Sequence, residues 1–326
     1  MPKLTVVFFS SAPIGIPFLE ALIQDERFEI IWIVTQPDQP SGRWMEIKSN
    51  VIKEWYLNNT DCHADTSLDS NQELAMTIVT PNTLRLDSKK YPWEWGKFQE
   101  WLQNLHPDYI VVIAYGKIIP QHILDIPSIA PINIHGSLLP KYRWASPIQT
   151  CLLQGEKESG ITIMKMSAWL DEWDIIKQLP IPLDITTTTK DLIQAFSFHG
   201  PQFTNQTLRD YSIGKEIAIV QDHSIATFTT KIEKEDGLVD IYTMPIEQIL
   251  RKYNAYYLWP KIYFIHNSKR VIIEELDVDQ NTYSELKYSP IADSDYIVNK
   301  CIKKLLVKPE GKKAMTREEF KIGYIK

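Results

Sequence analysis

Short apolar runs alternate with helical segments through the first two thirds of the chain, and this alternation constrains the fold most. The runs Leu4–Phe9 and Tyr109–Ala114 are nearly continuous in apolar residues, as in strands buried on both faces of a parallel sheet. Residues Phe28–Val34 and Ile132–His135 predict two more strands, and Pro17–Gln24 predicts a helix. The pattern favours an open, mostly parallel, twisted α/β sheet. Ligands of such sheets bind beyond the carboxyl ends of the strands.

The pattern changes after a polar, turn-rich stretch that begins near residue 210. Short strand-like runs follow at Arg270–Glu274 and Ile302–Val307, with one helical segment at Pro245–Tyr256. This change predicts a smaller, separate β-rich domain. A polar stretch in the first part of the chain, residues 58–76, predicts a surface insertion. The expected first domain, linker and second domain are residues 1–209, 210–225 and 226–326.

Composition and charge exclude several classes of protein. Hydrophobic residues make up 44% and charged residues 23% of the 326, as in a soluble globular protein. Cys62, Cys151 and Cys301 are too few and too far apart for a disulfide framework or a metal site. No apolar stretch approaches the length of a membrane span. We therefore expect a cytoplasmic protein that needs neither a metal nor a membrane.

The distribution of charge hints at a polyanionic partner. The chain has a net charge of -6, yet residues 300–326 contain nine basic and three acidic residues. A basic end on an acidic chain is one form that a binding surface for RNA or another polyanion takes. A solvated, lysine-rich tail explains the same pattern equally well.

The most informative segment is PINIHGSLLPKYRWASP, residues 131–147. Because side chains alternate along a strand, Asn133 and His135 lie on one face and Ile132 and Ile134 on the other. Two polar side chains on one face of a buried strand, beside a glycine turn, suit a site at the sheet's edge. On this spacing alone, a structural histidine is an equal alternative.

A neighbouring amide and imidazole suit acyl transfer. The amide can donate a hydrogen bond to a developing oxyanion, and a protonated imidazole can stabilise that oxyanion or relay a proton. A nearby carboxylate would fix the orientation of His135. The candidate is Asp171, which lies between two apolar stretches in residues 164–176. Taken alone, Asp171 would be interpreted as an ordinary loop aspartate.

These motifs resemble the signature of the 10-formyltetrahydrofolate-dependent formyltransferases, namely NIHGSLLPKYR at 133–143 followed by LDEWD at 170–174. Within that superfamily the chain is most similar to the branch that acts on methionyl-tRNA, because its C-terminal segments also match. The resemblance runs nearly end to end. The other matching segments are residues 34–43, 111–120, 226–240, 258–264 and 308–324.

The resemblance implies the following chemistry. The α-amino group of methionine on initiator tRNA attacks the formyl carbon of the co-substrate 10-formyltetrahydrofolate, a step that serves translation initiation. Asn133 and His135 match the residues that stabilise the tetrahedral oxyanion, and His135 also takes part in proton transfer. Asp171 matches the carboxylate that keeps the imidazole charged. No metal is implied.

The resemblance also implies the binding residues. Arg43 matches a loop arginine that engages the acceptor end of the tRNA. The second domain would be an OB-like β-barrel, whose basic end would contact tRNA phosphates. We expect a monomer. The matches to the turn that borders the folate are Ser137, Leu138, Leu139 and Pro140.

Tryptophan replaces glycine at four motif positions of this family: Trp44, Trp144, Trp169 and Trp173. The chain as a whole has 12 glycines and 10 tryptophans. Glycine is needed where the backbone takes a positive φ or a ligand comes close. We interpret the four exchanges as having one cause. The gene uses a genetic code in which UGA means glycine, and its UGA codons were translated as tryptophan. A protein made with these tryptophans should be poorly active.

Three alternatives stay open. If the tryptophans are genuine, the chain is a degenerate, inactive homologue that binds tRNA or folate. The second alternative is a formyltransferase that acts on an amine of a nucleotide sugar or a purine precursor, but such enzymes lack the C-terminal segment that matches at residues 308–324. The third is a hydrolase that releases formate from the same folate, and its C-terminal architecture would also differ. A dinucleotide-binding dehydrogenase is excluded, because SSAPIG after the first strand lacks the required glycine spacing.

Overall fold

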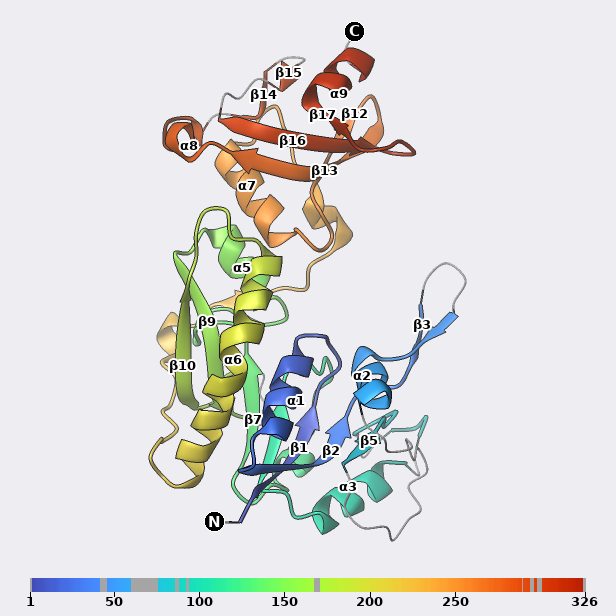
Figure 1. The fold of residues 1–326 in the computed structure, drawn as a ribbon, viewed down its shortest axis with the longest axis vertical. Coiled ribbons are helices and arrows are strands. Elements are labelled where there is room, and N and C mark those ends of the chain that lie inside the picture. The colour runs from blue at the N-terminus through green and yellow to red at the C-terminus, as the bar shows by residue number, and fades with distance from the viewer. Residues whose placement is uncertain are drawn as a thin grey trace. The chain divides into compact units, whose positions relative to one another are not determined.

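The computed structural model describes most of the chain (Figure 1). The described residues are 2–41, 46–59, 76–85, 88–91, 94–166, 171–288, 290–293, 296–297 and 301–324. They divide into two compact units, each described by itself below. Unit 1 comprises Met1–Arg143, Gly160–Ile181 and Ala195–Thr227, and unit 2 comprises Trp144–Ser159, Pro182–Gln194 and Phe228–Lys326.

Unit 1 is built on a twisted sheet which, within the described residues, has seven strands in the order β10-β9-β7-β6-β1-β2-β5. β1 pairs in parallel with β2 and β6, and the pairs β2–β5 and β6–β7 are parallel too, whereas β7–β9 is antiparallel. The strands are β1 (Leu4–Phe9), β2 (Phe28–Val34), β5 (Thr77–Val79), β6 (Tyr109–Val112), β7 (Ala130–His135), β9 (Glu158–Lys165) and β10 (Ile175–Pro182). The predicted open, mostly parallel sheet is confirmed.

Continuous burial explains why the central strands form. Val6–Phe9 in β1 are fully buried, and all of β6 is buried as well, because helices cover the sheet. Gly200 in α6 lies so close to Phe18 of α1 that a Cβ atom would contact the ring at 2.4 Å. Helices α1 and α6 therefore cover the same face of the sheet (Figure 1). The helices are α1 (Gly15–Gln24), α2 (Val51–Asn59), α3 (Glu94–Asn104), α4 (Gln121–Leu124) and α6 (Thr189–Ser212), the last of which begins in unit 2.

Unit 2 contains an antiparallel sheet which, in the described part of the chain, has four strands in the order β12-β13-β16-β17. The arrangement is consistent with the small barrel that the sequence predicts. Its strands are β12 (Tyr263–His266), β13 (Lys269–Val278), β16 (Ile302–Pro309) and β17 (Met315–Thr316), and its helices are α5 (Pro147–Gln154), α7 (Ile246–Ala255), α8 (Gln280–Leu286) and α9 (Arg317–Tyr324).

Amphipathic helices complete the core of unit 2. Helix α7 buries Ile246, Ile249, Leu250 and Tyr253, which stand at positions i, i+3, i+4 and i+7 and so share one face. Phe320 of α9 packs edge-on against Phe264 of β12, with the ring centroids 6.0 Å apart. Short strands pair elsewhere in the chain: β3 (Gln39–Ser41) with β4 (Glu46–Lys48), β8 (Arg143–Trp144) with β11 (Phe228–Thr229), and β14 (Ala292–Asp293) with β15 (Tyr296–Ile297).

No helix among the described residues is both long enough and apolar enough to cross a membrane.

Candidate active site

The carboxyl end of β7 presents Asn133 and His135 on one face of the sheet. β7 lies between β6 and β9, so its backbone is held on both sides, and His135 is in register with Thr162. Ile132 and Ile134 point to the other face and are buried. The strand therefore places the amide and the imidazole side by side, as the alternation predicts.

Asp171 faces both of these side chains through a single oxygen atom. Its Oδ1 lies 3.7 Å from Nδ1 of His135 and accepts a hydrogen bond from Nδ2 of Asn133 at 3.4 Å. The side chains of His135 and Asp171 are only 7% and 12% exposed. Water screens such a pair weakly, so a carboxylate here stabilises a positive charge on the ring. The structure thus brings together the three residues predicted to be catalytic.

The second ring nitrogen of His135 is also occupied. Nε2 lies 2.9 Å from the backbone carbonyl of Tyr142. A carbonyl can only accept, so Nε2 carries a hydrogen and donates a hydrogen bond to it. Nδ1 is the ring nitrogen that faces Asp171. Sequence reasoning missed Tyr142, because a backbone carbonyl leaves no signature in residue type.

The turn after β7, Ser137–Pro140, is held by hydrogen bonds from two neighbouring strands. Thr162 Oγ1 in β9 donates to the Ser137 carbonyl at 2.6 Å and accepts from the Leu139 amide at 3.1 Å. Gln178 Nε2 in β10 donates to the Leu139 carbonyl at 2.8 Å. Ser137 Oγ closes the turn by donating to the Lys141 carbonyl at 2.6 Å. Side-chain hydrogen bonds therefore hold the backbone of the turn predicted to border the folate.

The close packing of Leu138 in this turn requires glycine at position 160 in β9. A Cβ atom on Gly160 would lie 2.5 Å from Leu138 Cδ2 and 2.4 Å from the Leu179 carbonyl oxygen. Neither contact is possible for a larger residue, so Gly160 lets the turn pack closely on β9. Sequence reasoning did not single out Gly160, Thr162 or Gln178.

The predicted tRNA contact Arg43 lies outside the described residues, and so do Trp44 and Trp169. The base of the hairpin β3–β4, which carries Arg43, is described. Asp38 accepts hydrogen bonds from Lys53 Nζ at 2.8 Å and from the Asn50 amide at 3.0 Å. The hydrogen bond from Lys53 is the main reason why the pKa of Asp38 is lowered from its usual value.

Two of the unusual tryptophans are described. Trp144 has φ = 81°, in the left-handed region that favours glycine, and its half-exposed ring lies 4.7 Å from that of Phe228. Trp173 follows two residues after Asp171. Its buried indole N–H finds no hydrogen-bond partner in the part of the chain that the structure describes. Both observations are unfavourable for tryptophan, since a buried donor without a partner costs stability.

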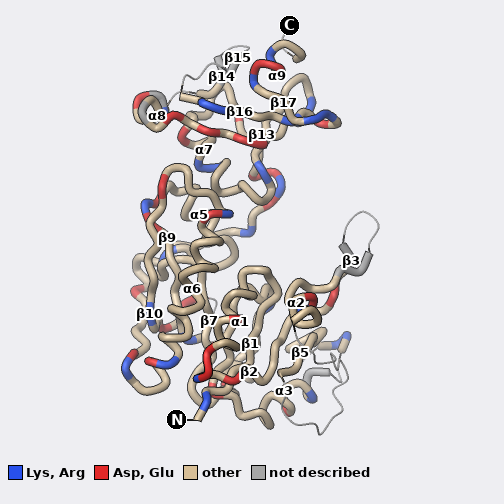
Figure 2. The backbone as a smooth tube through the Cα atoms, viewed as in Figure 1, with Lys and Arg blue, Asp and Glu red and all other residues tan. Residues whose placement is uncertain are grey.

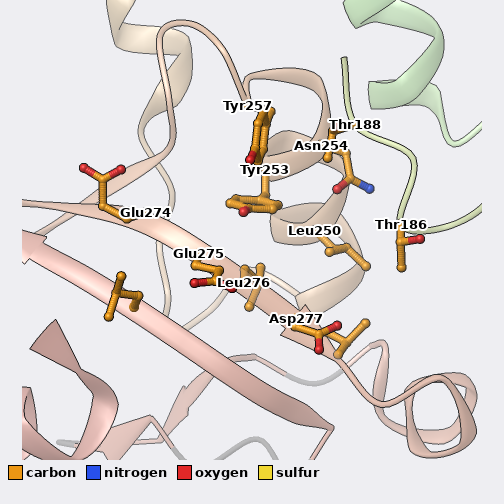
Figure 3. Close-up of a pocket in the computed structure, with 12 residues that line it drawn as sticks. Thr186, Thr188, Leu250, Tyr253, Asn254, Tyr257, Glu274, Glu275, Leu276 and Asp277 are labelled. Atoms are coloured by element: carbon orange, nitrogen blue, oxygen red, sulfur yellow. The ribbon is translucent and has the colours of Figure 1, made fainter. Parts of the chain in front are cut away.

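Unit 2 contains a separate cavity of about 580 Å³ between α7 and β13 (Figure 3). Tyr253 and Tyr257 face three acidic residues of β13 across it. Two of these acids have lysine partners: Glu274 pairs with Lys261, and Glu275 with Lys304 at 2.7 Å. None of the predicted site residues lines this cavity, so the candidate active site remains the constellation at the end of β7.

Comparisons with known proteins place this geometry in a family. Residues 3–208 match the family model "Formyl transferase", and residues 231–324 match "Formyl transferase, C-terminal domain". The methionyl-tRNA formyltransferase of Caldicellulosiruptor saccharolyticus is 33% identical over 84% of this chain and 79% of its own length. That of Caldanaerobacter subterraneus subsp. tengcongensis is 29% identical over 98% of this chain and 96% of its own length.

A solved structure supports the fold independently. The N-formyltransferase from Helicobacter canadensis, in complex with folinic acid and dTDP-3-aminofucose, aligns with a TM-score of 0.59 at 16% identity. The alignment covers 97% of this chain and 99% of that one. Two family models that together span most of the sequence, and a relative at 33% identity, agree with it. The chain belongs to the formyltransferase family.

Proposed function

We propose that this chain transfers the formyl group of 10-formyltetrahydrofolate to the α-amino group of methionine on initiator tRNA, and so serves translation initiation. The observation that carries the proposal is the convergence of Asn133 and His135 on Oδ1 of Asp171. The curated relatives named methionyl-tRNA formyltransferases support the choice of acceptor.

The roles of the three residues follow from their hydrogen-bonding capacity. The methionine nitrogen forms a bond to the formyl carbon, and the carbonyl oxygen takes up negative charge. An N–H of Asn133 and the protonated ring of His135 stabilise that oxyanion. Asp171 stabilises the positive ring. The bond from the formyl carbon to N10 of the folate then breaks, N10 gains a proton, and the attacking amine loses one.

The binding residues are assigned with the same proposal. Ser137, Leu138, Leu139 and Pro140 border the folate, and Arg43 engages the acceptor end of the tRNA. Residues 1–209 form the catalytic domain, joined by the linker 210–225 to the tRNA-binding domain 226–326.

Basic residues of unit 2 support contact with nucleic acid. They lie along β16 and the turn that follows it (Figure 2). Lys308, Lys312 and Lys313 among them are exposed. Exposed lysines of this kind neutralise phosphates and position a nucleic acid without reading its sequence.

A second candidate function depends on the tryptophans. If they are genuine, the chain is an inactive homologue that binds tRNA or folate. The positive φ of Trp144 instead supports glycine at that position, and hence UGA codons read as glycine. Codon UGG at positions 44, 144, 169 and 173 of the gene would refute the recoding.

The proposal is tested with two proteins, the printed sequence and a form with glycine at positions 44, 144, 169 and 173. Each is incubated with 10-formyltetrahydrofolate and either initiator methionyl-tRNA or a dTDP-linked amino sugar, and the products are weighed by mass spectrometry. We expect the glycine form to formylate the methionyl-tRNA and the printed form to be at least about tenfold slower. If the glycine form neither binds folate nor formylates methionyl-tRNA, the proposal is wrong. Formylation of the sugar alone would identify another amine as the acceptor.

A further inference from the structure

The side chain of Gln221, in the predicted linker, contacts the segment that carries Asp171. Gln221 is 4% exposed. Its Nε2 donates to two backbone carbonyls of that segment, at 3.0 Å to Asp171 and at 2.6 Å to Trp173. One amide group therefore holds the backbone on both sides of Glu172.

Arg143 holds Gln221 in turn. Its guanidinium donates to Gln221 Oε1 from Nη2 at 2.8 Å and from Nε at 3.3 Å. Arg143 is 1% exposed, and a buried guanidinium is stable only when its donors are satisfied. Arg143 also contacts His223 Nδ1 at 3.1 Å and a carboxylate oxygen of Glu172 at 3.7 Å. Arg143 thus reaches the Asp171 turn directly and through Gln221.

The same chain segment also meets the imidazole. The backbone carbonyl of Tyr142, directly before Arg143, accepts a hydrogen bond from Nε2 of His135. The dipeptide Tyr142–Arg143 therefore orients the ring from one side and the Asp171 turn from the other. A displacement of either would change the distance between Nδ1 of His135 and Oδ1 of Asp171.

Asp171 needs such support because its backbone is strained. Its φ is 58°, in the left-handed region, which is less favourable than the right-handed one for a residue with a Cβ atom. A strained conformation persists only where the surroundings fix it. In this turn the Gln221 amide supplies hydrogen bonds on both sides of Glu172.

We propose that Gln221 is a positioning residue for formyl transfer, which fixes the backbone of the Asp171 turn so that the carboxylate faces Nδ1 of His135, and that Arg143 orients Gln221. The inference rests on the proposed function and adds to it two residues that touch neither substrate. It also gives the last part of the linker a role in the site.

Matched variants separate positioning from stability. Gln221→Met has a similar shape without the amide, and Gln221→Glu keeps an oxygen for Arg143 but loses both donors. The control is Asn205→Leu in α6, because Asn205 is also 4% exposed and donates to a backbone carbonyl, that of Ala21, at 2.8 Å. All are made in the four-glycine protein and compared by melting temperature and by initial rates of methionyl-tRNA formylation.

We expect both Gln221 variants to lower kcat about 10- to 100-fold, with KM for the folate changed less than about threefold. Asn205→Leu should lower the melting temperature similarly and leave kcat within about twofold. Adding Gln221→Met to Asp171→Asn should cost little beyond the single Asp171 change, because both act on one interaction. The inference would be overturned if the losses of kcat from Gln221→Met and Asp171→Asn multiplied in the double variant. It would also be overturned if the Gln221 variants kept a kcat as high as that of Asn205→Leu. If the four-glycine parent itself forms no formyl-methionyl-tRNA, it is the proposed function that has failed.

Discussion

Oδ1 of Asp171 lies 3.7 Å from Nδ1 of His135, on the side of the ring opposite the carbonyl of Tyr142. This relationship gives the two ring nitrogens different tasks. Nε2 anchors the ring to the backbone, while Nδ1 shares the carboxylate with the Asn133 amide. An imidazole and an amide N–H donor are thereby placed together, and both are groups that can stabilise an oxyanion.

Replacing the carboxylate of Asp171 should remove the negative charge that faces His135 without moving the imidazole ring. We expect Asp171→Asn to lower kcat about 100-fold or more, as loss of an orienting carboxylate does elsewhere. Initial rates of methionyl-tRNA formylation by the variant and its parent check this. An unchanged kcat would show that Asp171 is only structural.

Removing the amide should affect the transition state more than binding. Asn133→Ala removes a donor to the oxyanion, and such a loss costs about 10²- to 10³-fold in kcat. KM for the folate should change little, since the ground-state carbonyl is a weaker acceptor. Steady-state kinetics with the folate varied decide the point. A rise in KM at constant kcat would place Asn133 in binding instead.

Much of the sheet could be predicted because its strands are buried on both faces. The predicted limits of the strands Leu4–Phe9 and Phe28–Val34 are those observed. The edge strand β10 was not predicted, because its sequence IIKQLPIP is partly exposed and mixes polar residues and prolines with the apolar ones. The spacing of apolar residues alone cannot identify such a strand.

Some residues of the candidate site could be predicted from the sequence, and others could not. Asn133 and His135 could be paired from strand alternation, whereas Asp171 could be placed only through the family resemblance. Tyr142 and Gln221 could not be found, because Tyr142 acts through its backbone and Gln221 through contacts that only the folded chain creates. The roles of Arg43, Trp44 and Trp169 remain predictions.

The backbone at Trp144 makes a prediction about stability that is independent of activity. Trp144→Gly and Trp144→Ala both remove the contact with Phe228, so their comparison isolates the backbone. Because φ is 81°, the glycine variant should be more stable by about 1 kcal/mol. Trp173 is not among the described residues with a positive φ, so there alanine should be at least as stable as glycine. Urea unfolding of the four variants tests this. Equal stability of the two Trp144 variants would contradict the argument for glycine.

The ion pair at the base of the β3–β4 hairpin predicts a pH-dependent stability. The folded-state pKa of Asp38 is lowered, mainly by the hydrogen bond from Lys53. The contribution of Asp38 is therefore present above its usual pKa near 3.8 and is lost as the pH falls through the lowered folded value. We expect Asp38→Asn to cost about 1 kcal/mol at pH 7 and progressively less below pH 4. A cost that stays constant down to the lowest pH at which the protein folds would refute the assignment.

The central claim is that formyl transfer takes place at His135, and a single-turnover experiment tests it most directly. The four-glycine protein and its His135→Ala variant, each in excess over initiator methionyl-tRNA, are mixed with 10-formyltetrahydrofolate and quenched at set times. We predict that formyl-methionyl-tRNA forms in the first protein and that the rate falls at least about 10³-fold in the variant, while both bind folate equally. Formyl transfer at an undiminished rate by His135→Ala would contradict the account.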